Sequence, residues 1–89
     1  MSIPARLQAA FGLFQSGQVE AAAKACAAIV REAPATADAH HLLGIIAFRT
    51  GQINEAAAHD DRAIRADPRQ PEFRNTRGAI ARAAGDLAG

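Results

Sequence analysis

Few side chains in this sequence are suited to chemistry, and the best candidates are His40-His41 and His59-Asp60-Asp61. Adjacent residues on a helix diverge by about 100°, so His40 and His41 cannot chelate one ion from the same face. A His-Asp pair can take part in metal-dependent hydrolysis of phosphate esters, but such a site needs further histidines and aspartates on other helices. No further histidine follows His59 in this chain. We therefore interpret both clusters as polar residues on helix surfaces, and expect no metal, no catalytic site and no enzyme activity.

Cys26 is the single cysteine, which excludes an intramolecular disulfide and a cysteine-based zinc site. We expect it to act as a small apolar residue rather than as a nucleophile. The glycines do not form a phosphate-binding loop, so no cofactor is predicted. The first residues lack the pattern of a signal peptide, and no apolar stretch approaches the ~20 residues that span a bilayer. These features predict a cytoplasmic protein without a membrane segment.

The composition favours helices. The chain has 89 residues, of which 49% are apolar, and it contains neither Trp nor Tyr. Alanine provides much of the apolar content and has the highest helix propensity of any residue. Residues 62–89 hold six arginines against three acids, although the whole chain carries a net charge of only +1. This arginine-rich end could meet an acidic partner or form a solvated helix face. The arginines lack interleaved aromatic residues, so we expect no nucleic acid binding.

The sequence repeats with a period of 34 residues. Gly17-Gln18-Val19 recurs as Gly51-Gln52-Ile53, and a second step of 34 takes Gly51 to Gly85. Further matches at this offset are Phe14 with Phe48, Ala22 with Ala56, Val30 with Ile64, Pro34 with Pro68, Gly44 with Gly78 and Ile46 with Ile80. A fixed period of this length is typical of architectures built from stacked supersecondary units.

Glycine and proline divide each unit into two helices. Gly17 can adopt the left-handed turn that ends a helix, and Pro34 cannot continue one. The pattern predicts five helices, over about 3–16, 19–33, 37–50, 53–67 and 71–84, with Gly85 ending the last. The connections are short, so successive helices must lie antiparallel. The predicted units are repeat one over 3–36, repeat two over 37–70, and a partial repeat or capping helix over 71–89.

This arrangement resembles the tetratricopeptide repeat (TPR) family, whose period is 34 residues. The second unit carries the resemblance best. Leu43-Gly44 matches the family's leucine-glycine pair, and Ala56 and Ala63 match its two small positions in the second helix. Pro68 matches its closing proline. The first unit is looser, with Ala22 and Pro34 in place and Ala9-Ala10 instead of leucine-glycine. The resemblance implies an all-α, right-handed α-solenoid of antiparallel helix pairs.

Several positions depart from the family pattern. Arginine or histidine holds the large aromatic positions of the first helices, Asp60 holds an aromatic position of a second helix, and Arg77 holds a leucine position. In the stacking that the resemblance implies, Asp60 and Arg77 should face one another. We therefore predict a partly buried ion pair between them that sets the docking angle of the fifth helix. The residues assigned a structural role are Gly17, Ala22, Pro34, Gly44, Gly51, Ala56, Asp60, Ala63, Pro68, Arg77 and Gly78.

The first helices also carry a second apolar face. Leu7, Phe11 and Phe14 are spaced i, i+4, i+7, which places them on one side of a helix. Their counterparts 34 residues later are His41, Ile45 and Phe48. The resemblance implies that this face lines the concave surface of the superhelix, although the phenylalanines could instead fill the joints between units. The predicted partner-binding groove comprises Leu7, Phe11, Phe14, His41, Ile45, Phe48, Arg49 and Arg82.

The sequence thus predicts a protein-protein interaction module that binds a peptide in its groove, either an amphipathic helix or an apolar segment. Two alternatives remain open. The chain could be the N-terminal regulatory or substrate-presenting segment of a larger enzyme, such as a bacterial TPR-containing transferase. It could also self-assemble as a scaffold through its open repeat end, because an uncapped end exposes apolar surface.

Overall fold

The protein consists of five helices that follow one another in a single file of antiparallel neighbours. In the computed structural model, which describes residues 2–88 and the side chains of residues 2–85, these are α1 (Ile3–Gln15), α2 (Val19–Glu32), α3 (Ala37–Arg49), α4 (Ile53–Ala66) and α5 (Pro71–Ala88). The described residues contain no strand. The body extends over 45 × 28 × 19 Å. Each helix packs on the next along the chain, as expected for an α-solenoid.

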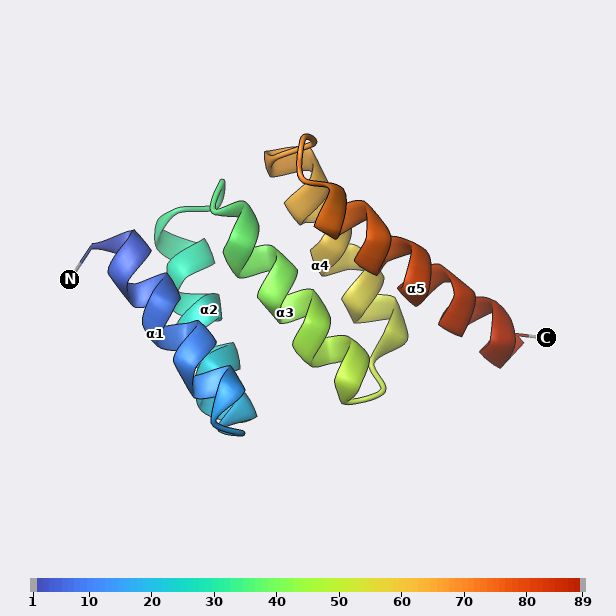
Figure 1. Cartoon of the computed structure of the whole chain (residues 1–89), viewed down its shortest axis with the longest axis horizontal. Helices are drawn as coiled ribbons and strands as arrows, with labels where there is room; N and C mark the ends of the chain where they lie inside the picture. Colours follow the sequence, from blue (N-terminus) through green and yellow to red (C-terminus); the bar gives the residue numbers. More distant parts are fainter. Residues whose placement is uncertain (1, 89) are drawn as a thin grey trace.

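The helices form two layers. Figure 1 shows α1, α3 and α5 following one another across the molecule, with α2 behind and between α1 and α3, and α4 behind and between α3 and α5. The helix α3 packs on both α2 and α4, which do not pack on each other. The prediction of an all-α fold built from antiparallel helix pairs is confirmed.

Two glycines make the tight turns within the helix pairs. Gly17 and Gly51 have φ angles of 87° and 82°, which L side chains rarely adopt. After α1, the amide of Gln18 donates to the carbonyl of Leu13, and the same bond joins Gln52 to Ala47 after α3. Both turns are therefore Schellman motifs, which satisfy carbonyls that the helix end would otherwise leave unpaired.

The fifth helix does not end at Gly85, as predicted, but continues to Ala88. Gly85 does not adopt a positive φ, unlike Gly17 and Gly51. A glycine inside a helix costs only about 1 kcal/mol relative to alanine, so it permits a turn without forcing one. The turns at Gly17 and Gly51 are stabilised because α2 packs back on α1 and α4 on α3. Within the described residues, no helix follows α5 to stabilise a third turn.

Small side chains form much of the core. The buried alanines are Ala10, Ala22, Ala39, Ala47, Ala56 and Ala63, packed with Ile29, Leu42, Ile46, Phe73 and Ile80. Small residues at helix crossings bring the backbones close together. At Gly44 the fit is tightest, because an added Cβ would lie 3.3 Å from the carbonyl oxygen of Ala56 in α4. This close approach fixes α3 against α4.

Candidate functional site

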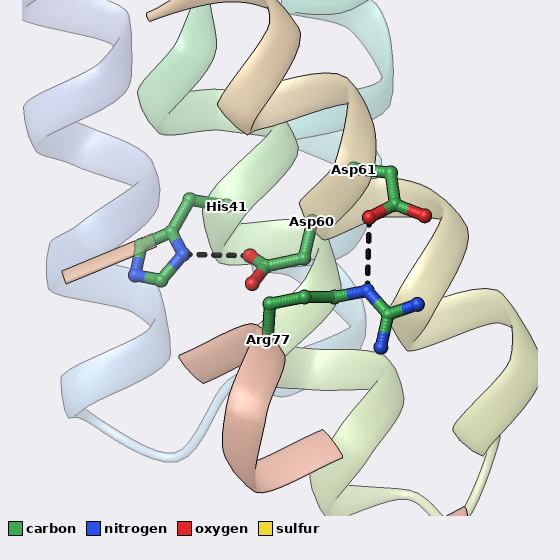
Figure 2. Close-up of polar contacts among 4 residues, drawn as sticks. All are labelled: His41, Asp60, Asp61 and Arg77. Atoms are coloured by element: carbon green, nitrogen blue, oxygen red, sulfur yellow. Dashed lines mark hydrogen bonds and ion pairs between the residues drawn. The ribbon is translucent and has the colours of Figure 1, made fainter. Parts of the chain in front are cut away.

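A buried polar pair joins α3 to α4. The Nδ1 atom of His41 donates to Oδ1 of Asp60 at 2.9 Å, and the two residues are 7% and 0% exposed. Figure 2 shows the imidazole of His41 pointing at this carboxylate. The His41 ring also packs on the ring of Phe73 in α5, with the centroids 4.6 Å apart. His41 therefore belongs to the joint between α3, α4 and α5, and its predicted place in the partner-binding groove is wrong.

The predicted ion pair between Asp60 and Arg77 is also wrong. The Nε atom of Arg77 donates instead to Oδ1 of Asp61, at 2.9 Å (Figure 2). These two side chains are 33% and 48% exposed, whereas Asp60 is fully buried. A guanidinium keeps its head in water at little cost and loses hydration in the core. Arg77 therefore pairs with the neighbouring aspartate at the surface.

Burial dominates the electrostatics of Asp60. It raises the pKa of the carboxyl above its usual value, and the hydrogen bond from His41 and the positive charge of Arg77 oppose this rise only in part. Its second oxygen, Oδ2, is buried without a hydrogen-bond partner among the described residues. An incompletely satisfied buried carboxylate is costly to the fold. We interpret the pair as a positioning device for α4 and α5 rather than as a reactive centre.

The repeat explains where this polar pair comes from. At the 34-residue offset, His41 and Asp60 correspond to Leu7 and Cys26, an apolar residue and a small one. Asp60 also needs space, and Gly44 supplies it by replacing Ala10 of the first helix pair. The Oδ1 atom of Asp60 would lie 3.4 Å from a Cβ added at Gly44. The joint appearance of His41, Asp60 and Gly44 was the sequence signal for this pair.

The remaining titratable candidates do not form a reactive cluster. His40 is buried at 8% exposure, and its Nε2 donates to the carbonyl of Pro34 at 2.7 Å. The expectation that His40 and His41 are surface residues is therefore wrong. Burial raises the pKa of the fully buried Cys26 to about 11, which disfavours the reactive thiolate. Among the side chains that the structure describes, those of residues 2–85, no three His, Cys, Asp or Glu residues are grouped as a metal ion requires.

The predicted structural residues occupy three kinds of position. Ala22, Ala56 and Ala63 are fully buried at the helix crossings, whereas Pro34 and Pro68 are exposed in the connections. Gly78 differs from Gly44, because a Cβ added there would meet only the end of the Arg82 side chain, at 3.8 Å. No atom of another described helix lies within 4 Å of that Cβ, so Gly78 does not have the close-packing role that Gly44 has in α3.

The predicted groove residues other than His41 lie at or near the surface. Leu7, Phe11 and Phe14 of α1 and Ile45 and Phe48 of α3 are partly buried, and we call these five residues the apolar stripe. The first three pack against the core with one side, as does Phe48, so they serve as joints as well as surface. Leu7 and Phe11 border a shallow hollow of about 530 Å³ on α1.

An arginine contacts the apolar stripe, and a second, Arg82 of α5, corresponds to Phe48 at the 34-residue offset. The guanidinium of Arg49 lies over the ring of Phe14, 4.7 Å from its centroid, and links α3 to α1 by a cation–π contact. Arg49 and Arg82 are both exposed. The structure thus combines partly exposed aromatic rings with exposed positive charge.

A larger hollow lies on the other layer, between α2 and α4, and was not predicted. It has a volume of about 700 Å³, and its floor is formed by Leu43, Ile46 and Ala47 of α3. At the 34-residue offset Leu43, Ile46 and Ala47 correspond to Ala9, Gly12 and Leu13, so the repeat comparison gives no sequence signal for this hollow. None of the helices described is both long and apolar enough to cross a membrane.

Comparison with known proteins agrees with this geometry. A family model described as tetratricopeptide repeat matches residues 7–71. The chain belongs to the tetratricopeptide repeat family. This family is defined by a non-catalytic helical repeat and generally mediates protein-protein interaction. A search of curated proteins found no match.

Among solved structures, the TPR chain is similar to a mutant O-GlcNAc transferase from Thermobaculum terrenum. The two share 32% sequence identity and superimpose with a TM-score of 0.84 over 88% of this chain. The match spans only 15% of the transferase chain. The TPR chain therefore corresponds to a small part of that protein.

Proposed function

We propose that this TPR chain is a protein-interaction module that holds a peptide or an amphipathic helix against the apolar stripe on α1 and α3. The observation that carries the proposal is the set of partly exposed apolar side chains at repeat-related positions, namely Phe11 with Ile45 and Phe14 with Phe48. Repetition places similar anchors side by side on neighbouring helices, and stacked repeats use such extended surfaces for binding.

The charges around the apolar stripe favour a particular ligand. Arg49 contacts Phe14, and both Arg49 and Arg82 are exposed, so acidic residues beside the apolar anchors of the ligand would add electrostatic attraction. The contact between Arg49 and Phe14 also holds the Phe14 ring in place before binding, which lowers the entropy cost of association. A few aromatic side chains would supply most of the affinity.

The test is an affinity capture with two variants. Phe11→Ala/Phe48→Ala removes two anchors, and its fold is checked by circular dichroism because both side chains also pack against the core. Arg49→Glu/Arg82→Glu changes only exposed residues, so it tests the same surface without removing core atoms. The matched control is Arg69→Glu/Arg74→Glu, which makes the same charge change at exposed positions away from the apolar stripe.

We expect partners captured by the wild-type protein to be lost from both stripe variants and retained by the control. Each lost anchor should cost about 1–2 kcal/mol, which weakens the affinity roughly five- to thirtyfold. Partners that bind the two stripe variants and the wild type equally would refute the proposal.

A second candidate function follows from the similarity to the transferase. The similarity, at 32% identity over 88% of this chain, supports a role as a repeat segment that presents substrates to a catalytic domain. We propose this role only for a longer polypeptide that includes these residues. An antibody against residues 2–88 would detect a species far above 9.3 kDa in the source cells if the proposal is correct, and a species of about that mass if it is wrong.

A further inference from the structure

The hollow between α2 and α4 is a second candidate binding surface, separate from the apolar stripe. We define this outer groove by its apolar residues Val19, Ala23, Ala27 and Val30 on α2 and Leu43, Ile46 and Ala47 on α3. It lies between α2 and α4, whereas the apolar stripe lies on α1 and α3. Its volume of about 700 Å³ is within the range of sites that hold ligands.

Packing explains why the outer groove is open. The helices α2 and α4 both pack on α3 but not on each other, which leaves a channel above α3. Small side chains deepen this channel, because Ala23 and Ala27 form its α2 wall and Ala47 lies in its floor. Val19, Ala23, Ala27, Val30 and Leu43 are each only partly buried, so apolar surface remains available there.

The rim of the outer groove is charged in a polarised way. The helices α2 and α4 run in the same direction, because each is antiparallel to the α3 helix between them (Figure 1). Glu20 and Glu55 lie in their first turns, so one end of the groove is acidic. Lys24 follows one turn later, and Arg31 lies in the last turn of α2 at the other end.

The α4 rim of the groove carries Glu55 at its acidic end and His59 further along. His59 lies halfway along this rim, and Arg62 contacts it, with Nη1 3.4 Å from Nδ1. Burial and the charge of Arg62 lower the pKa of His59, so the imidazole is neutral at neutral pH. The rim therefore has both of its acids, Glu20 and Glu55, at one end, Lys24 one turn further along, and Arg31 at the other end.

These features indicate what can occupy the groove. Its apolar floor and walls are helical, so they offer no strand edge to pair with the backbone of an extended peptide. A helix satisfies its own backbone and can pack its side chains into the channel between two parallel helices. The 14 residues of α2 correspond to about 21 Å, or roughly four helical turns.

We propose that the outer groove binds one amphipathic α-helix of a partner protein, three to four turns long. Its apolar face packs on Ala27, Leu43 and Ala47. Basic residues at one end lie beside Glu20 and Glu55, and acidic residues at the other end lie beside Arg31. Charge complementarity fixes the direction of the bound helix. This surface is independent of the one in the proposed function.

The experiment uses a designed 16-residue peptide as the probe, fluorescein-labelled and helical. It has lysines in its first turn, leucine and alanine at i, i+3, i+4 and i+7, and glutamates in its last turn. Fluorescence anisotropy measures its affinity for the wild-type protein and for Ala27→Trp, which fills the groove from a partly exposed wall position. The control is Ala58→Trp, the same change at an exposed α4 position outside the lining of the groove.

We expect saturable binding that weakens about tenfold or more in Ala27→Trp and less than about twofold in Ala58→Trp. The variant Glu20→Lys/Glu55→Lys should bind this peptide less tightly than the wild type does. It should bind a second peptide with glutamates at both ends more tightly than the wild type does. This reciprocal exchange tests the charge argument without changing the apolar floor.

Three results would overturn the inference. The first is a lack of saturable binding by the wild type, and the second is equal affinity of the peptide for Ala27→Trp and Ala58→Trp. The third is loss of peptide binding in the folded Phe11→Ala/Phe48→Ala variant, because that result would place the peptide on the apolar stripe. Sedimentation also gives a decisive outcome. A wild-type dimer that Ala27→Trp dissociates would show that a second copy of this chain covers the groove.

Discussion

Replacing Gly44 by alanine tests the packing on which the fold depends. An added Cβ would lie 3.3 Å from the carbonyl oxygen of Ala56, 3.4 Å from Oδ1 of Asp60 and 3.5 Å from the amide nitrogen of Asp60. All three atoms belong to α4, and two of them are backbone atoms that cannot move without shifting the helix. Gly44→Ala should therefore push α3 and α4 apart by a few tenths of an ångström.

Two opposing effects set the magnitude. Alanine gains about 1 kcal/mol over glycine inside a helix, whereas forcing an extra methyl group into a packed core costs about 1–3 kcal/mol. The net change at Gly44 should lie between neutral and about 2 kcal/mol of destabilisation. At Gly78 the nearest atom to an added Cβ is 3.8 Å away, and at Gly12 nothing lies within 4 Å. Those two substitutions should keep the full helix gain and stabilise the protein.

The assay is thermal and urea unfolding followed by circular dichroism at 222 nm for the three single variants. Gly44→Ala should be less stable than Gly78→Ala by about 1–3 kcal/mol, and a domain of this size changes its Tm by roughly 4–8 °C per kcal/mol. If Gly44→Ala raises the Tm as much as Gly12→Ala does, the close crossing of α3 and α4 is refuted.

Three further predictions concern the buried and paired side chains. Burial raises the pKa of Asp60 in the folded state, so ionisation of Asp60 lowers the free energy of unfolding as the pH rises above about 4. The stability of Asp60→Asn relative to the wild type, measured by urea unfolding, should therefore increase from pH 4 to pH 7. A relative decrease over this range would contradict the sign. Arg77 and Asp61 are partly exposed, so a double-mutant cycle with alanine should give a coupling energy of only about 0.2–1 kcal/mol; zero coupling would refute the pair. Burial raises the pKa of Cys26 to about 11, so at pH 8 only about one thiol in a thousand is ionised. The native protein should therefore react with Ellman's reagent far more slowly than the protein unfolded in urea. Equal reaction rates would show that the thiol is accessible in the folded protein.

Much of the fold could be predicted because glycine and proline mark its turns. The 34-residue spacing of Gly17 and Gly51 predicts two helix pairs, and both residues adopt the left-handed conformation that these turns require. The same reasoning was wrong at Gly85, where the residue type is the same but α5 continues as a helix. A glycine allows a turn, and the packing of the following helix decides whether the turn forms.

The polar residues were predicted less well because sequence spacing does not determine which way a side chain turns. Asp60 lies on the buried face of α4 with Ala56 and Ala63, and Gly44 leaves space for its side chain. The adjacent Asp61 lies about 100° around the helix, where it meets Arg77. His41 occupies a position that the repeat assigns to the groove face, yet it turns toward Asp60. A comparison of His41, Asp60 and Gly44 as a group with their repeat counterparts Leu7, Cys26 and Ala10 would have identified the buried polar pair.

The sequence predicted the position of the apolar stripe and left open whether its rings line the surface or fill the joints between units. The i, i+4, i+7 spacing places Leu7, Phe11 and Phe14 on one face, and all three remain partly exposed. They also pack against the core, because helices of 13 or 14 residues with alanine-rich crossings have few large side chains to fill the joints. One set of rings therefore serves the core on one side and the surface on the other.

The central claim is that partners are held on the apolar stripe, and chemical-shift mapping tests it most directly. A segment of a captured partner is titrated into ¹⁵N-labelled protein, and the amide shifts are followed residue by residue. The account predicts the largest shifts at Phe11, Phe14, Ile45 and Phe48, with Ala58 of α4 unchanged. Shifts confined to α2 and α4, with the α1 and α3 amides unmoved, would contradict it.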